Sequence, residues 1–177
     1  MADKPDAVAL LKADHRKVED LFETYEKAKS DSVKKSLVEQ ICTELTVHAT
    51  IEEEIFYPAC TGQIEEDTLT EAYVEHDGAK VIIAELSASG PDNEFYDSKV
   101  KVLSEQIKHH VKEEEMRVEG MFAQARDAGL DMEALGDRMA ARKAELLAEI
   151  KAKGLPTPQT RSFTGHKLVQ SEPVAAI

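Results

Sequence analysis

The sequence His48-Ala-Thr-Ile-Glu52 sets a histidine and a glutamate four residues apart, and His110-Val-Lys-Glu-Glu114 repeats this spacing. One further histidine precedes each stretch, His15 in the first copy and His76 in the second. The lone histidine precedes the stretch by 33 residues in the first copy (48 − 15) and by 34 residues in the second (110 − 76). A repeat of metal-ligand residue types at matched spacing indicates a two-metal site.

Apolar residues around these stretches recur at steps of three and four, which is the period of an amphipathic α-helix. No alternating strand pattern of useful length interrupts them. Asp131 is the predicted N-cap of the last helix, and Gly154 follows its end. The predicted helices cover residues 8–25, 31–60, 68–87, 94–127 and 131–153.

Four helices of comparable length with short connections predict an all-α fold, an antiparallel up-down-up-down four-helix bundle. The fifth helix either caps the bundle or contacts a second subunit. We therefore expect a metal-binding bundle over residues 1–128, an accessory amphipathic helix over 129–154 and a flexible tail over 155–177.

Composition and charge narrow the classes of partner. The net charge of −13 on 177 residues repels nucleic acid backbones and anionic membranes, so we expect neither as a partner. The N-terminal stretch lacks the apolar region of a secretory signal, and no run of about 18 apolar residues predicts a membrane span. Cys42 and Cys60 lie too far apart on one predicted helix to form a disulfide. These features predict a cytoplasmic protein with reduced thiols.

Helical spacing explains why the polar pairs need a counter-charge. His48 and Glu52 share one face of their helix, as do His110 and Glu114, and both pairs lie on apolar stripes. A buried carboxylate costs several kcal/mol unless it is paired. Lys80 is the only basic residue near the stripes at that depth, so a metal pair is expected to supply the remaining positive charge.

The fourth helix offers two overlapping registers, because His109 and Glu113 repeat the spacing one residue earlier. The apolar stripe assigns His110 and Glu114 to the core and His109 to the helix flank, about 100° away. The stripe consists of Leu103, Ile107, Val118 and Met121. The other glutamates of 52–54 and 113–115 are expected to face solvent or to support the ligands, and His166 in the tail carries no signal.

Imidazole combined with carboxylate suits iron, and also manganese or zinc. Ferritin-like di-iron bundles use the motif Glu-x-x-His, which occurs nowhere in this chain. Ferritin-like chemistry is therefore not expected.

Over about residues 6–127 the chain resembles bacterial hemerythrin-like proteins of the cation-binding HHE type. The stretch Glu52-Glu-Glu-Ile-Phe-Tyr-Pro58 strengthens the likeness, because that family often ends its first motif in an aromatic residue and proline. The resemblance implies an antiparallel four-helix bundle with a non-haem di-iron centre, two Fe ions (Fe2+/Fe3+) joined by carboxylates and an oxo, hydroxo or water bridge. The metal ligands that it implies are His15 and His48 on one iron, His76 and His110 on the other, and Glu52 and Glu114 as bridges.

The chain departs from the oxygen-carrying members in two places. Lys80 stands where they have a histidine four residues after the one that matches His76, and the last motif is His-x3-Glu in place of His-x4-Asp. Lys80 is expected to extend toward solvent. A tyrosine or water could fill the vacant ligand position, although core or interface packing is the usual role of buried tyrosines. The tyrosines considered are Tyr25, Tyr57 and Tyr73.

These departures favour reactive di-iron chemistry over oxygen transport. The leading hypothesis is a di-iron protein that binds dioxygen, peroxide or nitric oxide in oxidative or nitrosative stress. The alternatives are a peroxide-decomposing enzyme of the catalase or peroxidase type, an iron-buffering protein, and a purely structural bundle. The expected partners are small molecules, in a monomer or a homodimer.

Overall fold

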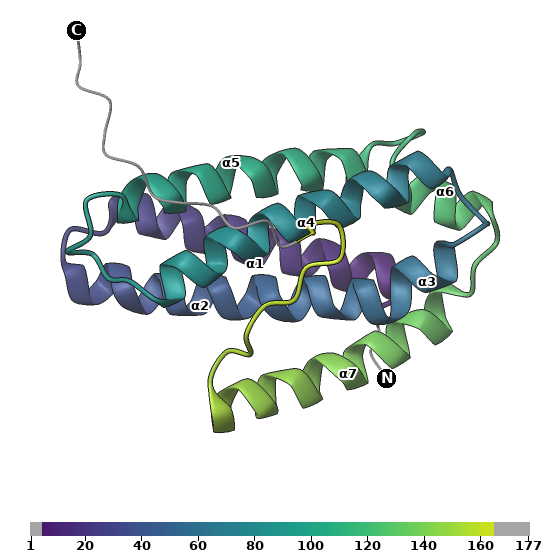
Figure 1. The fold of residues 1–177 in the computed structure, drawn as a ribbon. Helices are drawn as coiled ribbons and strands as arrows, with labels where there is room; N and C mark the ends of the chain where they lie inside the picture. The colour runs from purple at the N-terminus through teal and green to yellow at the C-terminus, as the bar shows by residue number, and fades with distance from the viewer. Residues whose placement is uncertain (1–4, 165–177) are drawn as a thin grey trace, which may run out of the picture.

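The computed structural model describes residues 5–164, which form helices and connecting turns without a strand. Figure 1 shows four long helices that lie alongside one another: α1 (Ala7–Lys27), α2 (Asp31–Ile51), α4 (Glu66–Ser87) and α5 (Tyr96–Glu115). Helix α1 contacts α2, α2 contacts α4, α4 contacts α5, and α5 contacts α1, so the contacts close a ring. The prediction of an all-α fold is confirmed.

The last helix, α7 (Met132–Lys153), packs against α1 and α2 of its own chain (Figure 1). Its predicted N-cap is confirmed, since the side chain of Asp131 accepts a hydrogen bond from the backbone N–H of Ala134 at 3.0 Å. The helix ends at Gly154, which has a φ of 81° that an L side chain rarely adopts. Within this chain α7 therefore covers one side of the helix ring.

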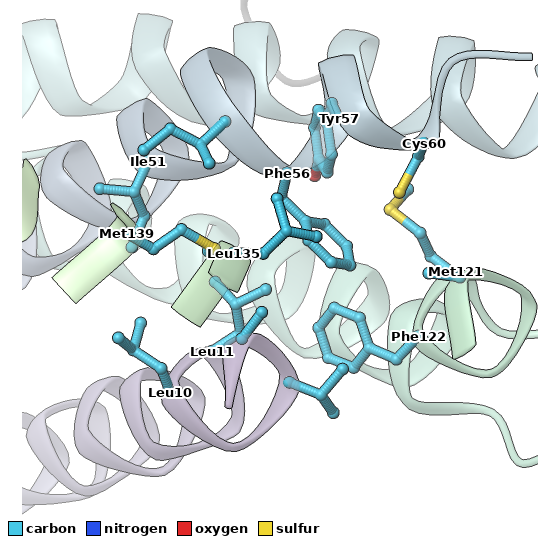
Figure 2. Close-up of a cluster of buried hydrophobic side chains, with 14 of the residues drawn as sticks. Leu10, Leu11, Ile51, Phe56, Tyr57, Cys60, Met121, Phe122, Leu135 and Met139 are labelled. Carbon is cyan, nitrogen blue, oxygen red and sulfur yellow. The ribbon is translucent and has the colours of Figure 1, made fainter. Parts of the chain in front are cut away.

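Apolar side chains gather in two clusters, one toward each end of the long helices. One cluster joins α1, the end of α2, α7 and the short helix α6 (Met121–Asp127), and Figure 2 shows Phe56 and Phe122 facing each other within it. The rings of Phe56 and Phe122 meet edge to face at 5.8 Å. The second cluster includes Phe22, Ile41 and Leu103. Helices α1, α2 and α4 contribute to both clusters, whereas the apolar residues of α5 belong to the second and those of α6 to the first.

The fourth predicted helix, over residues 94–127, is not continuous. Helix α5 ends at Glu115, and α6 begins at Met121 after a turn. Val118, predicted on the core stripe, is 78% exposed. Gly120 makes the turn possible, because a Cβ there would lie 2.5 Å from the backbone oxygen of Met116. The turn swings α6 inward, so its apolar residues close the first cluster.

The second predicted helix also differs from the expected regular form. A π-helical segment, η1 (Glu52–Phe56), follows α2, and the short helix α3 (Tyr57–Cys60) follows η1. The backbone N–H of Tyr57 bonds to the carbonyl of Glu52, five residues back. Such π-helical turns occur often at functional sites.

The first part of the predicted flexible tail packs on the helices. Residues beyond Gly154 run from the end of α7 across α2 to α4 (Figure 1). There the backbone N–H groups of Arg161 and Ser162 donate to a carboxylate oxygen of Asp77 at 2.7 and 2.6 Å. Asp77 is fully buried, so these bonds satisfy a carboxylate that has no access to water. The rest of that predicted tail, including His166, lies outside the described residues.

Cys42 and Cys60 are both buried free thiols. Within residues 5–164, no helix has the length and apolar character that crossing a membrane requires.

Gly136 offers a test of how α7 is attached. A Cβ at this position would lie 2.8 Å from backbone atoms of residues 5–7, so even alanine forces α7 and the start of α1 apart. We expect Gly136→Ala to lower the free energy of unfolding by about 1–3 kcal/mol, despite the better helix propensity of alanine. Urea unfolding measures this change. An equal or higher stability than that of the wild type would contradict the close contact.

Candidate metal centre

The six side chains predicted as metal ligands converge at the level between the two apolar clusters. Each of them is at most 6% exposed. They are His15 from α1, His48 from α2, Glu52 from η1, His76 from α4, and His110 and Glu114 from α5. All four long helices therefore contribute to one buried polar group.

The histidines meet in the two pairs that the resemblance implies. The Nε2 atoms of His15 and His48 lie 3.2 Å apart, and so do the Nε2 atoms of His76 and His110. In both pairs the rings are inclined at about 60° and their centroids lie 4.8 Å apart. The repeat in the sequence therefore corresponds to a repeat in space.

The two glutamates connect these pairs. An oxygen of Glu52 lies 3.1 Å from Nε2 of His48 and 3.3 Å from Nε2 of His76. An oxygen of Glu114 lies 3.3 Å from Nε2 of His15 and 3.5 Å from Nε2 of His110. Each carboxylate thus touches one histidine of each pair, which is the placement that a bridging ligand requires.

Each histidine also has a carboxylate on its outer, Nδ1 side. The distances are 2.8 Å from His15 to Glu115, 2.9 Å from His76 to Glu53, 2.7 Å from His110 to Glu75 and 3.7 Å from His48 to Asp14. An outer carboxylate that accepts from Nδ1–H fixes the tautomer and leaves the Nε2 lone pair facing inward. Sequence reasoning missed Asp14 and Glu75, although each directly precedes a lone histidine.

This donor set fits a pair of cations. Four inward Nε2 atoms and two glutamates share a space from which water is largely excluded. Potential ligand atoms lie within 4.8 Å of one another in each of two groups, which are His15, His48, Glu52 and Glu114, and Glu52, His76 and His110. Among residues 5–164, one oxygen of Glu52 and one of Glu114 have no hydrogen-bond partner. Buried oxygens of this kind are costly unless a proton or a metal ion meets them.

The pKa values of the metal-free protein show the same shortage of positive charge. Burial alone would lower the pKa of His48, but Glu52 and Asp14 raise it to about 10. Burial also opposes a charge on His76, yet Glu52 and Glu53 raise its pKa to about 9. Protons on these two imidazoles therefore provide the positive charge that neutralises the glutamates.

Basic residues surround the group but neutralise only its outer carboxylates. Lys80 was expected to reach solvent, and this expectation is wrong. Its ammonium group pairs with Glu53 at 2.7 Å and with Asp77 at 3.2 Å, and its side chain is only 16% exposed. Lys143 of α7 pairs in the same way with Asp14. At the position where oxygen carriers have a further histidine, this chain therefore has Lys80, whose ammonium group pairs with the outer carboxylate of Glu53.

Tyr57 is the main residue that sequence reasoning undervalued. Its hydroxyl lies 3.2 Å from Nε2 of His76, 3.2 Å from one oxygen of Glu114 and 3.4 Å from Glu52. In a regular α-helix, residue i+5 lies about 140° around the axis from residue i. The π-helical turn removes most of this offset, so Tyr57 follows Glu52 into the same space. No apolar periodicity in the sequence signals that turn.

The other two tyrosines that were considered lie elsewhere. The hydroxyl of Tyr25 donates to Asp97 at 2.6 Å. Tyr73 packs its ring edge-on against Tyr57, with ring centroids 5.2 Å apart. Burial and the neighbouring Glu114 and Glu52 raise the pKa of Tyr57 well above its usual value, so its hydroxyl remains a proton donor.

His109 lies outside the buried group. Its side chain is 60% exposed, and its Nε2 lies 3.1 Å from Glu113 and 3.6 Å from Glu75. Glu54, the outermost of its run of three glutamates, pairs with Arg142 of α7 at 2.7 Å. The overlapping register in the fourth helix therefore forms a separate cluster on the surface.

A cavity of about 400 Å³ reaches the buried group from beneath α7. All four inner histidines line it, together with residues of α7 and of the segment that follows. Its apolar walls include Val18, Leu45, Ile83, Ile107 and Leu146. The cavity is large enough for a small molecule beside the histidines, and its walls limit the number of water molecules there.

The raised histidine pKa values predict how stability depends on pH. In unfolded chains histidine has a pKa of about 6.5, so the stabilisation from His48 and His76 is complete below that pH and is lost as pH rises through about 9 to 10. We expect metal-free protein to lose on the order of a few kcal/mol of stability across this window. Thermal unfolding measured along a pH series tests the slope. His109→Ala should leave it unchanged, and a flat profile in the wild type would contradict the charge assignment.

Comparisons with known proteins identify the family and the fold. The Hemerythrin HHE cation binding domain family matches residues 6–122. A crystal structure of a hemerythrin HHE cation binding domain-containing protein from Mycobacterium kansasii superposes with a TM-score of 0.68 at 23% identity, covering 85% of this chain and 95% of that chain, which shows a shared fold. A Nostoc sp. protein named DNA nickase is 28% identical over 106 residues, which are 60% of this chain but only 30% of that protein. On the extent of the family match, the chain belongs to the hemerythrin HHE cation-binding domain family.

Proposed function

We propose that the chain is a non-haem di-iron protein and that α1, α2, α4 and α5 form an antiparallel up-down-up-down bundle around the metal pair. The bundle is supported by the ring of contacts and by the short connections between successive helices. The observation that carries the metal pair is the pairing of the histidines, with each glutamate touching both pairs.

In this proposal His15 and His48 hold one ion, His76 and His110 hold the other, and Glu52 and Glu114 bridge them. Imidazole with carboxylate suits iron, although manganese and zinc accept the same donors. The outer carboxylates keep the four rings in place and raise their basicity.

When bound, a di-iron centre with an oxygen bridge supplies the redox chemistry by which dioxygen, peroxide or nitric oxide can be bound. The chain supplies the surroundings. The cavity beneath α7 admits a small molecule, and its apolar walls limit bulk water beside the histidines. Tyr57 presents a protonated hydroxyl to the same space. We therefore infer a role in oxidative or nitrosative stress.

Peroxide decomposition is a second candidate function, and the position of Tyr57 favours it. Tyr57 holds a proton within hydrogen-bond distance of His76 and Glu114, from where it could be donated to peroxide in the same space. Iron buffering has less support, because the buried donors form two small groups that could each hold one ion. We do not propose nickase activity, since the chain spans 30% of that relative and its charge of −13 repels DNA.

Metal analysis followed by optical spectroscopy tests the proposal. Purified protein loaded with Fe2+ under anaerobic conditions should contain two iron ions per chain. The spectrum of this form should change when dioxygen, peroxide or nitric oxide is added, and release of oxygen from peroxide would identify the enzymatic alternative. Fewer than two ions per chain, or a site that accepts zinc alone, would contradict the di-iron assignment.

A further inference from the structure

One of the four outer carboxylates differs from the others in its charge partners. Glu53 pairs with Lys80 and Asp14 with Lys143, while Glu115 pairs with Arg16 at 2.6 Å. Glu75, the partner of His110, makes no ion pair with a lysine or arginine in the described part of the chain. Its second oxygen instead lies 3.6 Å from His109. This quarter of the site therefore lacks the fixed cation that the other three have.

His109 connects Glu75 to a second carboxylate. Its Nε2 lies 3.1 Å from an oxygen of Glu113, which likewise forms no ion pair with a lysine or arginine of residues 5–164. One donor atom from each of Glu75, His109 and Glu113 lies within 4.8 Å of the others. We call these three residues the outer cluster. One imidazole and two carboxylates form a donor set for a divalent transition-metal ion.

A second, smaller cavity leads from Glu75 and Glu113 of the outer cluster to the buried site. Its volume is about 120 Å³, and it extends from Glu119 at the surface to His110 and Glu114 inside. Its charged lining is acidic throughout, apart from the imidazole of His110, and includes Glu71, Glu75 and Glu113. Glu114, at the inner end, is 2% exposed and has one oxygen without a hydrogen-bond partner. That oxygen lies 3.3 Å from Nε2 of His15 and 3.5 Å from Nε2 of His110, so the passage ends at the buried centre, and its negative charge would attract cations inward.

We propose that the outer cluster binds a divalent transition-metal ion and delivers it through this passage to the buried centre. Glu75 lies between the two sites, since one of its oxygens is 2.7 Å from Nδ1 of His110 and the other faces His109. The sequence His109-His110-Val-Lys-Glu113-Glu114 therefore encodes two adjacent sites in overlapping registers. Metal ions enter by the acidic passage, whereas small molecules enter by the larger apolar cavity beneath α7. This inference rests on the proposed metal-binding function.

Titration with Co2+ tests the outer cluster in the full-length, metal-free protein. The wild type should bind two ions tightly and a third more weakly. His109→Gln and Glu113→Gln should retain the two tight ions and lose the third. In stopped-flow absorbance measurements at low Co2+, both variants should fill the tight sites at least about tenfold more slowly, because the outer cluster has lost one of its ligands. Glu66→Gln removes the same charge from the first turn of α4, outside the cluster, and should behave as the wild type.

The outcomes separate this inference from the function on which it rests. A wild type that binds only two ions, or variants that load as fast as the wild type, would overturn the outer site and leave the buried centre intact. A wild type that binds no ion tightly would instead overturn the proposed function. A slowdown of equal size in Glu66→Gln would also overturn the inference, since the effect would then come from net charge alone.

Discussion

Glu52→Ala is expected to abolish stoichiometric metal binding, with apparent affinity reduced by at least about a hundredfold. Glu52 is fully buried and is the carboxylate that joins His48 to His76. Its removal leaves two imidazoles of raised pKa without their main anionic neighbour. In the metal-free protein, breaking a buried ion pair of this kind costs about 3–5 kcal/mol. We therefore expect a lower unfolding midpoint as well as a loss of metal.

Two matched variants show whether position or charge is responsible. Glu54→Ala removes a carboxylate two residues away that is 45% exposed and pairs with Arg142, so it should retain both ions. Glu52→Gln keeps the size of the side chain but not its charge, and it should lose metal nearly as completely as Glu52→Ala. Metal content per chain and thermal unfolding measure both effects. Two tightly bound ions in Glu52→Ala would refute the bridging role.

The inner donor set was predictable because it follows local rules. Spacing of i and i+4 puts His48 beside Glu52 and His110 beside Glu114, and the apolar stripe decides which register faces inward. The cost of burying carboxylates then calls for a cation. His109 could be assigned to the outside on the same grounds, and its side chain is 60% exposed. These arguments use neighbours along one helix and need no knowledge of the tertiary fold.

The remaining features depend on contacts between distant segments or on irregular backbone. The expectation that Lys80 reaches solvent was wrong, because its partner Glu53 belongs to a different helical segment and no local pattern reveals the pair. Asp77 collects backbone N–H groups from residues far along the chain, which no local pattern reveals. The turn at Gly120 interrupts a run whose apolar period continues unbroken through Val118. Periodicity reports which face of a helix is apolar, but not where the backbone leaves the helix.

Tyr57 is the functionally important case of this kind. The sequence predicts core packing as the usual role of this tyrosine, and its ring does stack on His76 with centroids 5.3 Å apart. The π-helical segment adds a second role by directing the hydroxyl between His76 and Glu114. In the proposed metal-bound state, that oxygen can fill the coordination position for which Lys80 provides no ligand, or donate a proton to a bound small molecule. Both roles require the hydroxyl and not merely the ring.

Tyr57→Phe should therefore retain both metal ions and the fold but slow the reaction with peroxide or dioxygen by about a hundredfold or more, the usual contribution of a positioned proton donor. Loss of the hydroxyl removes a hydrogen bond to Glu114, with a cost of about 1–2 kcal/mol, which is too small to unfold the bundle. If the oxygen ligates ferric iron, the variant should also lose a tyrosinate-to-iron absorption band, which distinguishes ligation from proton donation.

Tyr73→Phe is the matched control, since it removes the same atom from the ring that packs edge-on against Tyr57. Stopped-flow spectroscopy of both variants, each loaded to two iron ions per chain, separates the effect of the hydroxyl from that of the aromatic packing. Equal rates in wild type and Tyr57→Phe would mean that the π-helical turn serves packing alone. A slow Tyr57→Phe beside a normal Tyr73→Phe would show that one irregular turn, set between two regular helical segments, places the reactive oxygen that the repeated histidine and glutamate motifs do not encode.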